Sequence, residues 1–372
     1  MNKRIAYYDQ LRVLAILGIV CCHVAADFIT RNHGLIMQHK TFFGVLLFSS
    51  GRLVGVPVFL MLSGALLINK KDTLSEFIKK RFNRVLIPFI FWASIYVIFA
   101  VVIQELEFTP QLVFNIFFGV KGGMGAILWF VWMLMVVYIA IFIINKILEY
   151  GKSKSDNFDT NFINVLVLLS LILYLVYNMV QQNFPDNNIY YYASFIPFAI
   201  FGYFLTHFDF TRIRIGKIDV TPGLIVKVTF ALSILAYLVF VFVIYQTSLA
   251  NGKFYSANYF DFHVLVFDFS LMLLFRYLPE CNGTVTKKVN GFLSSKNVAK
   301  AILSISTASY GMYLVHILII KLLEAKYLYR IKFYNSPTFW LPILLIVVFF
   351  SSWFVVWILS KIPYVNKISG AS

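Results

Sequence analysis

Long apolar runs separated by short polar segments recur along the whole 372-residue chain. A helix of about 20 such residues crosses the hydrocarbon core of a bilayer, and runs of roughly 18 or more with few charges predict membrane spans. The pattern predicts ten spans, at residues 9–29, 41–69, 85–104, 126–148, 161–181, 189–206, 223–246, 259–279, 299–321 and 338–360. No linker between them is long enough to hold a soluble domain. We therefore expect an all-α polytopic membrane protein in which residues 1–372 form a single domain.

One further apolar segment does not fit this pattern. FTPQLVFNIFFGVKGGMGAI (residues 108–127) is short and rich in glycine. It predicts a lipid-surface or re-entrant segment between the third and fourth spans.

Composition supports the same class of protein. Sixty per cent of the residues are hydrophobic, 13% are charged and the mean hydropathy is +0.81, whereas soluble domains carry about 25% charged residues. The net charge of +16 does not indicate nucleic-acid binding, because there is no soluble fold to present it.

The basic residues predict an orientation, since short cytoplasmic loops are enriched in Lys and Arg. With the N-terminus inside, 20 of the 32 Lys and Arg residues fall in cytoplasmic segments and eight in external ones. The other four, Arg12, Arg52, Lys227 and Arg276, fall within spans. Both termini are therefore expected to be cytoplasmic.

The first predicted span carries two ionisable side chains, Arg12 at its cytoplasmic end and His23 about halfway through. Eleven residues of α-helix cover about 16 Å and close to three turns, so both project from one face. Ionisable groups facing lipid are costly, and we expect this face to line a polar cavity open to the cytoplasm. The simpler alternatives are an interfacial anchor for Arg12 and a hydrogen-bonded packing role for His23.

The loop before the third span carries Arg81 and Arg84, which lie on one side if the loop is helical there. Two guanidinium groups on one face suit a phosphate-rich ligand, because each can bind oxygens bidentately. The alternative is a positively charged anchor against anionic lipid.

No two histidines have the spacing of a helical metal site and the sequence contains no Cys/His cluster, so no metal cofactor is expected. Cys21 and Cys22 adjoin His23. A packing role is expected for both, with a cysteine nucleophile as the alternative.

Several stretches resemble the membrane acyltransferase-3 family, and they occur in the family's order. YYDQLRVLAILGIVCCHVA resembles the family's first helix, with Arg, ten residues and then His, and GRLVGVPVFLMLSGALL resembles its second helix. RFNR fits the Arg-x-x-Arg element before the third helix, and LWFVWMLMVVY and SYGMYLVH resemble later stretches. These matches extend from about residue 7 to residue 316.

The resemblance implies an integral membrane O-acyltransferase, usually an O-acetyltransferase. Such an enzyme moves the acyl group of cytoplasmic acetyl-CoA to a hydroxyl of a cell-surface or lipid-linked glycan. The resemblance implies that His23 is the catalytic histidine and that Arg81 and Arg84 bind the CoA donor. Neutral imidazole suits removal of a hydroxyl proton during attack on a thioester, and direct transfer is favoured over an acyl-enzyme.

Other residues are candidates for supporting roles. Arg12 could hold the CoA phosphates or shape the route to His23, and Arg52 could donate to the developing oxyanion. Ser63 and Tyr310 are further oxyanion donors and are grouped with the donor-binding residues. The carboxylates that could orient the His23 ring are those of Asp9, Asp27, Asp261 and Asp268.

His316 lies near the middle of the ninth predicted span, in SYGMYLVH. We expect it to belong to a polar network, with a role as a second catalytic histidine as the alternative.

A transporter or flippase of a polysaccharide or lipid-linked sugar would also use a polytopic fold with an intramembrane arginine. The two halves show no convincing similarity, and the Arg-x-x-Arg loop has no counterpart, so the enzyme is favoured. Expected partners are membrane lipid, acyl-CoA and a hydroxyl acceptor, and the expected location is the bacterial plasma membrane. The sequence does not decide which acceptor is used, whether the donor carries acetyl or succinyl, or whether the chain forms a homo-oligomer.

Overall fold

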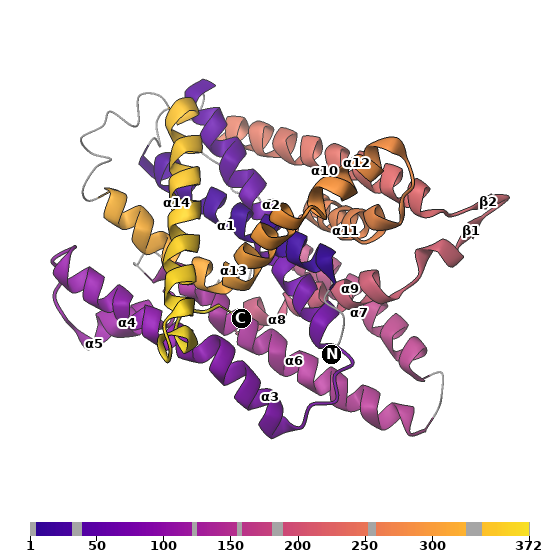
Figure 1. The fold of residues 1–372 in the computed structure, drawn as a ribbon, viewed down its shortest axis with the longest axis horizontal. Coiled ribbons are helices and arrows are strands. Elements are labelled where there is room, and N and C mark those ends of the chain that lie inside the picture. Colours follow the sequence, from indigo (N-terminus) through magenta and orange to yellow (C-terminus); the bar gives the residue numbers. More distant parts are fainter. Residues whose placement is uncertain are drawn as a thin grey trace.

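The structure is a computed structural model that describes residues 5–31, 39–120, 125–154, 158–180, 189–251, 258–324 and 337–371. The described chain is mostly helical (Figure 1). Its α-helices are α1 (Ala6–Arg31), α2 (His39–Leu67), α3 (Leu74–Arg81), α4 (Ile87–Val102), α5 (Pro110–Phe117), α6 (Trp129–Lys152), α7 (Phe158–Val180), α8 (Ile189–Ala193), α9 (Ile196–His207), α10 (Pro222–Asn251), α11 (Phe262–Tyr277), α12 (Thr284–Leu293), α13 (Lys296–Leu323) and α14 (Pro337–Lys361). The strands β1 (Arg214–Ile215) and β2 (Ile218–Asp219) pair antiparallel in a short hairpin.

Ten helical stretches of the described chain are long and apolar enough to cross a membrane. They are Ala6–Ala26, Leu46–Leu67, Leu74–Val102, Ala126–Lys152, Phe158–Tyr177, Ile189–His207, Pro222–Asn251, Phe262–Glu280, Lys296–Leu323 and Thr338–Lys361. By length and composition, the prediction of ten spans is confirmed. Between the third and fourth, Pro110–Phe117 forms the short helix α5, and the described part of the glycine-rich segment contributes no further span.

The third helical stretch begins earlier than its predicted start at residue 85. Thr73 caps α3 through a reciprocal pair of hydrogen bonds: its hydroxyl accepts from the Glu76 backbone N–H (3.3 Å), and the Glu76 carboxylate accepts from the Thr73 N–H (2.9 Å). A five-residue π-helix, Phe82–Leu86, then joins α3 to α4 without a break. The predicted loop is therefore helical from Leu74 onward.

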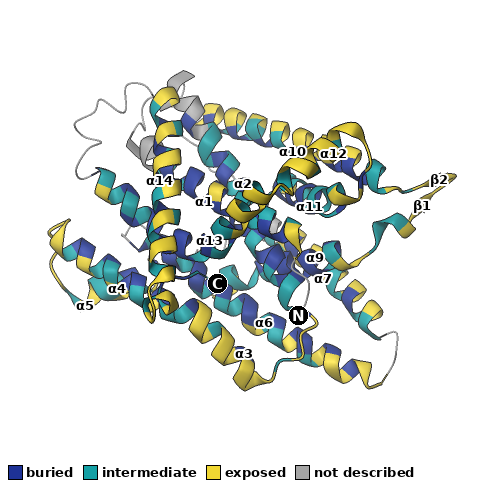
Figure 2. Ribbon diagram, in the orientation of Figure 1, coloured by how far each residue is buried: buried dark blue, intermediate teal, exposed yellow. Residues whose placement is uncertain are grey.

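Burial separates central helices from peripheral ones (Figure 2). Of the residues in the most apolar 18-residue stretch of each helix, 61% are buried in α1, 17% in α7 and 28% in both α10 and α14. The exposed faces of the peripheral helices carry large apolar side chains, as lipid contact requires. The core therefore lies around α1, α2, α6 and α13.

Small residues allow α2 to pack closely against two neighbours. A Cβ added at Gly51 would contact the Gly18 carbonyl oxygen and the Cys22 backbone nitrogen of α1. On the α9 side, a Cβ at Gly64 would contact the Ala199 backbone, and one at Gly202 would contact that of Met61. Apolar side chains gain little from leaving lipid tails that are equally apolar. Helices in a membrane are therefore held together largely by van der Waals contact, which small residues allow by letting the backbones approach closely.

Helices α1 and α13 lie side by side and run in the same direction. Asp9 near the start of α1 contacts Ser306 of α13, and His23 contacts His316 farther along both helices. This pairing brings the first and ninth spans together, although nearly 300 residues separate them in sequence.

Candidate active site

A cavity of about 510 Å³ opens among α1, α2, α3, α6 and α13. We call it the basic cavity, because the charged side chains that line it are mostly cationic. Its charged lining consists of Arg12, Lys70, Asp72, Lys80, Arg81 and Arg84. Such a surface can bind an anion that carries several phosphate oxygens.

Arg81 and Arg84 both line this cavity, as expected for side chains on one side of a helical loop. Arg81 ends α3, and its guanidinium lies 5.4 Å from the ring centre of Phe77 and 5.0 Å from that of Tyr138. These cation–π contacts hold the side chain against the cavity wall. Arg84 belongs to the π-helix, an arrangement found frequently at functional sites.

Arg12 lines the same cavity from α1, next to Asp9. The Asp9 carboxylate lies 3.8 Å from the Arg12 guanidinium and accepts a hydrogen bond from the Ser306 hydroxyl at 2.6 Å. Fourteen residues of helix place Asp9 roughly 21 Å along the axis from His23. The structure therefore brings Asp9 to Arg12, and does not bring it to the His23 ring.

His23 pairs with another histidine. Its Nδ1 lies 2.9 Å from the Ile19 carbonyl oxygen and 3.1 Å from Nε2 of His316, whose own Nδ1 lies 3.1 Å from the Met312 carbonyl oxygen. Carbonyl oxygens only accept, so in the neutral pair each Nδ1 carries the hydrogen, and His316 Nε2 accepts from His23. His23 Nε2 then carries a lone pair that can accept a proton, as a general base requires.

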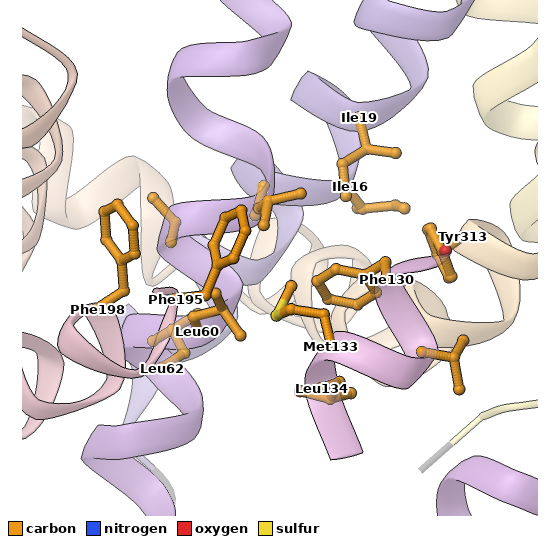
Figure 3. Packing of buried hydrophobic residues seen from close by; sticks show 14 of the residues in the cluster. Ile16, Ile19, Leu60, Leu62, Phe130, Met133, Leu134, Phe195, Phe198 and Tyr313 are labelled. Carbon is orange, nitrogen blue, oxygen red and sulfur yellow. The ribbon is translucent and has the colours of Figure 1, made fainter. Parts of the chain in front are cut away.

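A second, smaller cavity of about 50 Å³ contains His23. We call it the His23 chamber. Its lining consists of Ile19, Cys22, His23, Gly51, Arg52, Gly55, Val56, Ile127, Trp129, Phe130, Tyr259 and Tyr313. Ile19, Phe130 and Tyr313 line both cavities and therefore stand between them; Figure 3 shows the three side chains together.

Arg52 places a cation in the His23 chamber. Its guanidinium lies 4.6 Å from the ring centre of Tyr259 and 5.8 Å from that of Phe48. Burial raises the pKa of the Tyr259 phenol, although the positive charge of Arg52 opposes the shift, so the phenol stays neutral. Arg52 is thus the predicted oxyanion donor that shares a chamber with His23.

The structure does not place Ser63 or Tyr310 in the His23 chamber. Both line the basic cavity, where the Ser63 hydroxyl donates to the Phe59 carbonyl (3.0 Å) and the Tyr310 hydroxyl donates to the Val85 carbonyl (3.0 Å). Both side chains therefore line the same cavity as Arg81 and Arg84 and do not line the chamber that contains His23.

The remaining candidate carboxylates have other surroundings. Asp261 accepts from the Asn258 backbone N–H at 3.0 Å, and burial raises the pKa of its carboxyl group. Asp268 is fully buried in α11, with no hydrogen-bond partner for its carboxylate among the described residues. The side chain of Asp27 lies outside the described residues. Within the described chain, the ring partner of His23 is His316 rather than a carboxylate.

The direct contact of His316 with His23 is the feature that sequence reasoning missed. The only signal was the place of His316 near the middle of a span, in SYGMYLVH. A histidine at that depth needs a polar partner. Nothing in the local pattern identifies this partner as His23.

Comparison with known proteins identifies the family of the chain. The sequence model of the family described as an acyltransferase domain, acyltransferase-3, matches residues 5–357. The chain therefore belongs to the acyltransferase-3 family and is a multi-pass membrane acyltransferase. No curated protein and no solved structure gives a significant match.

Proposed function

We propose that the protein is an O-acetyltransferase that uses acetyl-CoA from the cytoplasm to acetylate a hydroxyl of a cell-surface or lipid-linked glycan. One observation carries the proposal. Three arginines line a cavity large enough for a sizeable anion, and a histidine with a free Nε2 lone pair lies in the adjoining chamber. In this proposal the basic cavity binds the phosphates of the donor, and His23 is the base that acts on the acceptor hydroxyl.

The transfer needs one base and one oxyanion donor. His23 Nε2 takes the proton of the acceptor hydroxyl, whose oxygen attacks the thioester carbon. Arg52 stabilises the negative charge that develops on the carbonyl oxygen. As the intermediate collapses, the C–O bond of the ester remains, the C–S bond breaks, and the imidazolium returns the proton to the departing thiolate. The products are an acetyl ester and free CoA.

The orientation follows from charge. The basic cavity is lined by Lys70, which precedes α3, and by Lys80, Arg81 and Arg84, which lie in the basic first part of the third helical stretch. Loops with this excess of Lys and Arg favour the cytoplasm, where CoA is found. The basic cavity therefore faces the cytoplasm in this proposal, as do both termini.

Release of CoA by the purified protein in lipid nanodiscs tests the proposal, with acetyl-CoA as donor and glycerol as surrogate acceptor. Wild type should bind acetyl-CoA and release CoA above the protein-free rate. His23→Ala should keep binding and lose turnover, whereas Arg84→Ala should bind poorly.

Two matched variants control for the loss of an arginine charge, as in Arg84→Ala, and of an imidazole ring, as in His23→Ala. Arg214→Ala removes an exposed arginine on β1, and His207→Ala removes a histidine that stacks on Tyr203, and neither residue lines the cavities. Both should retain binding and turnover. Absence of both binding and CoA release in wild type would refute the assignment and would favour transport through the same cavities.

A further inference from the structure

The basic cavity and the His23 chamber are separated by a wall of three side chains. Among the described residues, Arg12, Arg81 and Arg84 line only the basic cavity, whereas His23 and Arg52 line only the chamber. If CoA occupies the basic cavity, as in the proposed function on which this inference rests, its acyl end must reach past the wall to meet His23.

The wall is held in place on several sides. The Tyr313 hydroxyl donates to the Ile127 carbonyl, and the Tyr313 ring contacts that of Phe130 edge to face at 5.1 Å. The ring of Tyr310 stacks against that of Tyr313, with the ring centres 6.2 Å apart. Ile19, Phe130 and Tyr313 are each exposed by 5% or less, so neighbouring side chains cover most of their surface. Packed side chains of this kind resist changes of even one methylene.

The chamber behind the wall is small. Its volume of about 50 Å³ is several times the 10–15 Å³ or so that one water-sized group needs in the same measure. This is enough for the carbonyl and methyl groups of an acetyl unit. Compared with acetyl, a butyryl group adds two methylenes, and a succinyl group adds one methylene and a carboxylate. The chamber has no further room for either addition.

We infer that Ile19, Phe130 and Tyr313 form a size filter that restricts the transferred acyl group to acetyl. The filter acts on the step described above, in which the acyl carbon exchanges its bond to sulfur for a bond to the acceptor oxygen. The three residues set specificity by shape, and none of them takes part in proton transfer.

A panel of acyl-CoA donors tests the filter in the same nanodisc assay. With acetyl-, propionyl-, butyryl- and succinyl-CoA, the kcat/KM of wild type should fall by roughly tenfold or more for each added methylene. Succinyl-CoA is included because Arg52 offers a charge partner to its carboxylate, and it should still be rejected. Phe130→Ala should bring butyryl-CoA to within about threefold of acetyl-CoA.

Two further variants make the result specific. Phe354→Ala removes an exposed phenylalanine of α14 and should keep the wild-type preference. Ile19→Val removes one methylene from the wall with little risk to folding, and should improve propionyl-CoA relative to acetyl-CoA.

Each failure has a separate meaning. Wild-type turnover of butyryl-CoA at the rate of acetyl-CoA would refute the filter and leave the acyltransferase intact. Unchanged preference in both Phe130→Ala and Ile19→Val would also refute it. The absence of turnover with every donor would refute the proposed function instead.

Discussion

Replacement of His316 by leucine tests whether the histidine pair positions His23, the base in the proposed function. The substitution removes the Nε2 acceptor that lies 3.1 Å from His23 Nδ1, and leaves the Ile19 carbonyl as the ring's acceptor at 2.9 Å. His23 keeps its tautomer but loses the second contact that fixes the plane of its ring. His316 is therefore a positioning residue in this mechanism.

The magnitude follows from the charge on the ring in the transition state. As His23 takes the hydroxyl proton it becomes an imidazolium, and a hydrogen bond to a charged group contributes about 1.5–3 kcal/mol. Each 1.36 kcal/mol or so corresponds to a tenfold change in rate. The kcat of His316→Leu should therefore fall roughly 10- to 150-fold, while the KM for acetyl-CoA stays near that of wild type because the donor cations are untouched.

The assay is steady-state CoA release in nanodiscs, with the apparent Tm measured in parallel. His316→Gln is the matched control, because the Gln side-chain carbonyl can occupy the position of Nε2 and accept from His23. It should recover most of the lost kcat. A kcat for His316→Leu within twofold of wild type would refute the positioning role, as would equal losses in the leucine and glutamine variants at unchanged Tm.

Three further predictions concern the donor cations and the packing of the helices. Arg81→Ala should raise the KM for acetyl-CoA roughly tenfold or more and leave kcat unchanged. The increase in KM should be smaller at high salt, because salt screens the charge. A salt-independent loss of kcat would contradict a role in phosphate binding. Gly51→Leu should lower the apparent Tm, at a cost of about 1–3 kcal/mol of stability, because any Cβ at this position contacts the α1 backbone. Gly223→Ala should leave the Tm unchanged, since a Cβ there meets no atom within 4 Å. Equal Tm values for the two variants would contradict the close α1–α2 contact. Arg276 donates to the Leu205 and Phe208 carbonyls at 2.5 Å each, so Arg276→Met should cost about 1–3 kcal/mol of stability, and a Tm equal to that of wild type would show that these bonds contribute nothing.

The spans and the face shared by Arg12 and His23 could be predicted from sequence because both follow from local rules. Bilayer thickness sets the length of an apolar run, and helical periodicity aligns residues eleven apart. The π-helix that carries Arg84 could not be predicted in this way, since it interrupts the regular periodicity of the chain.

The partners of His23 depend on contacts between distant helices. The sequence offered four carboxylates for the His23 ring, yet Asp9 contacts Arg12 and Ser306, and His23 contacts His316 from α13. Which helices meet is decided by small residues such as Gly18 and Gly51, whose effect appears only when two helices are placed together. Residue spacing within one helix carries no such information.

The wall between the two cavities has a consequence for the barrier function of the membrane. On the proposed function, an acetyl group enters from the aqueous side that holds CoA and leaves attached to an acceptor on the other side, yet no continuous water path has to form. The bond exchange itself carries the group across, so the helices need not alternate between inward-open and outward-open states as those of a carrier do. On that function, acetyl groups can cross while the membrane keeps its ion gradients, because Ile19, Phe130 and Tyr313 separate the basic cavity from the His23 chamber.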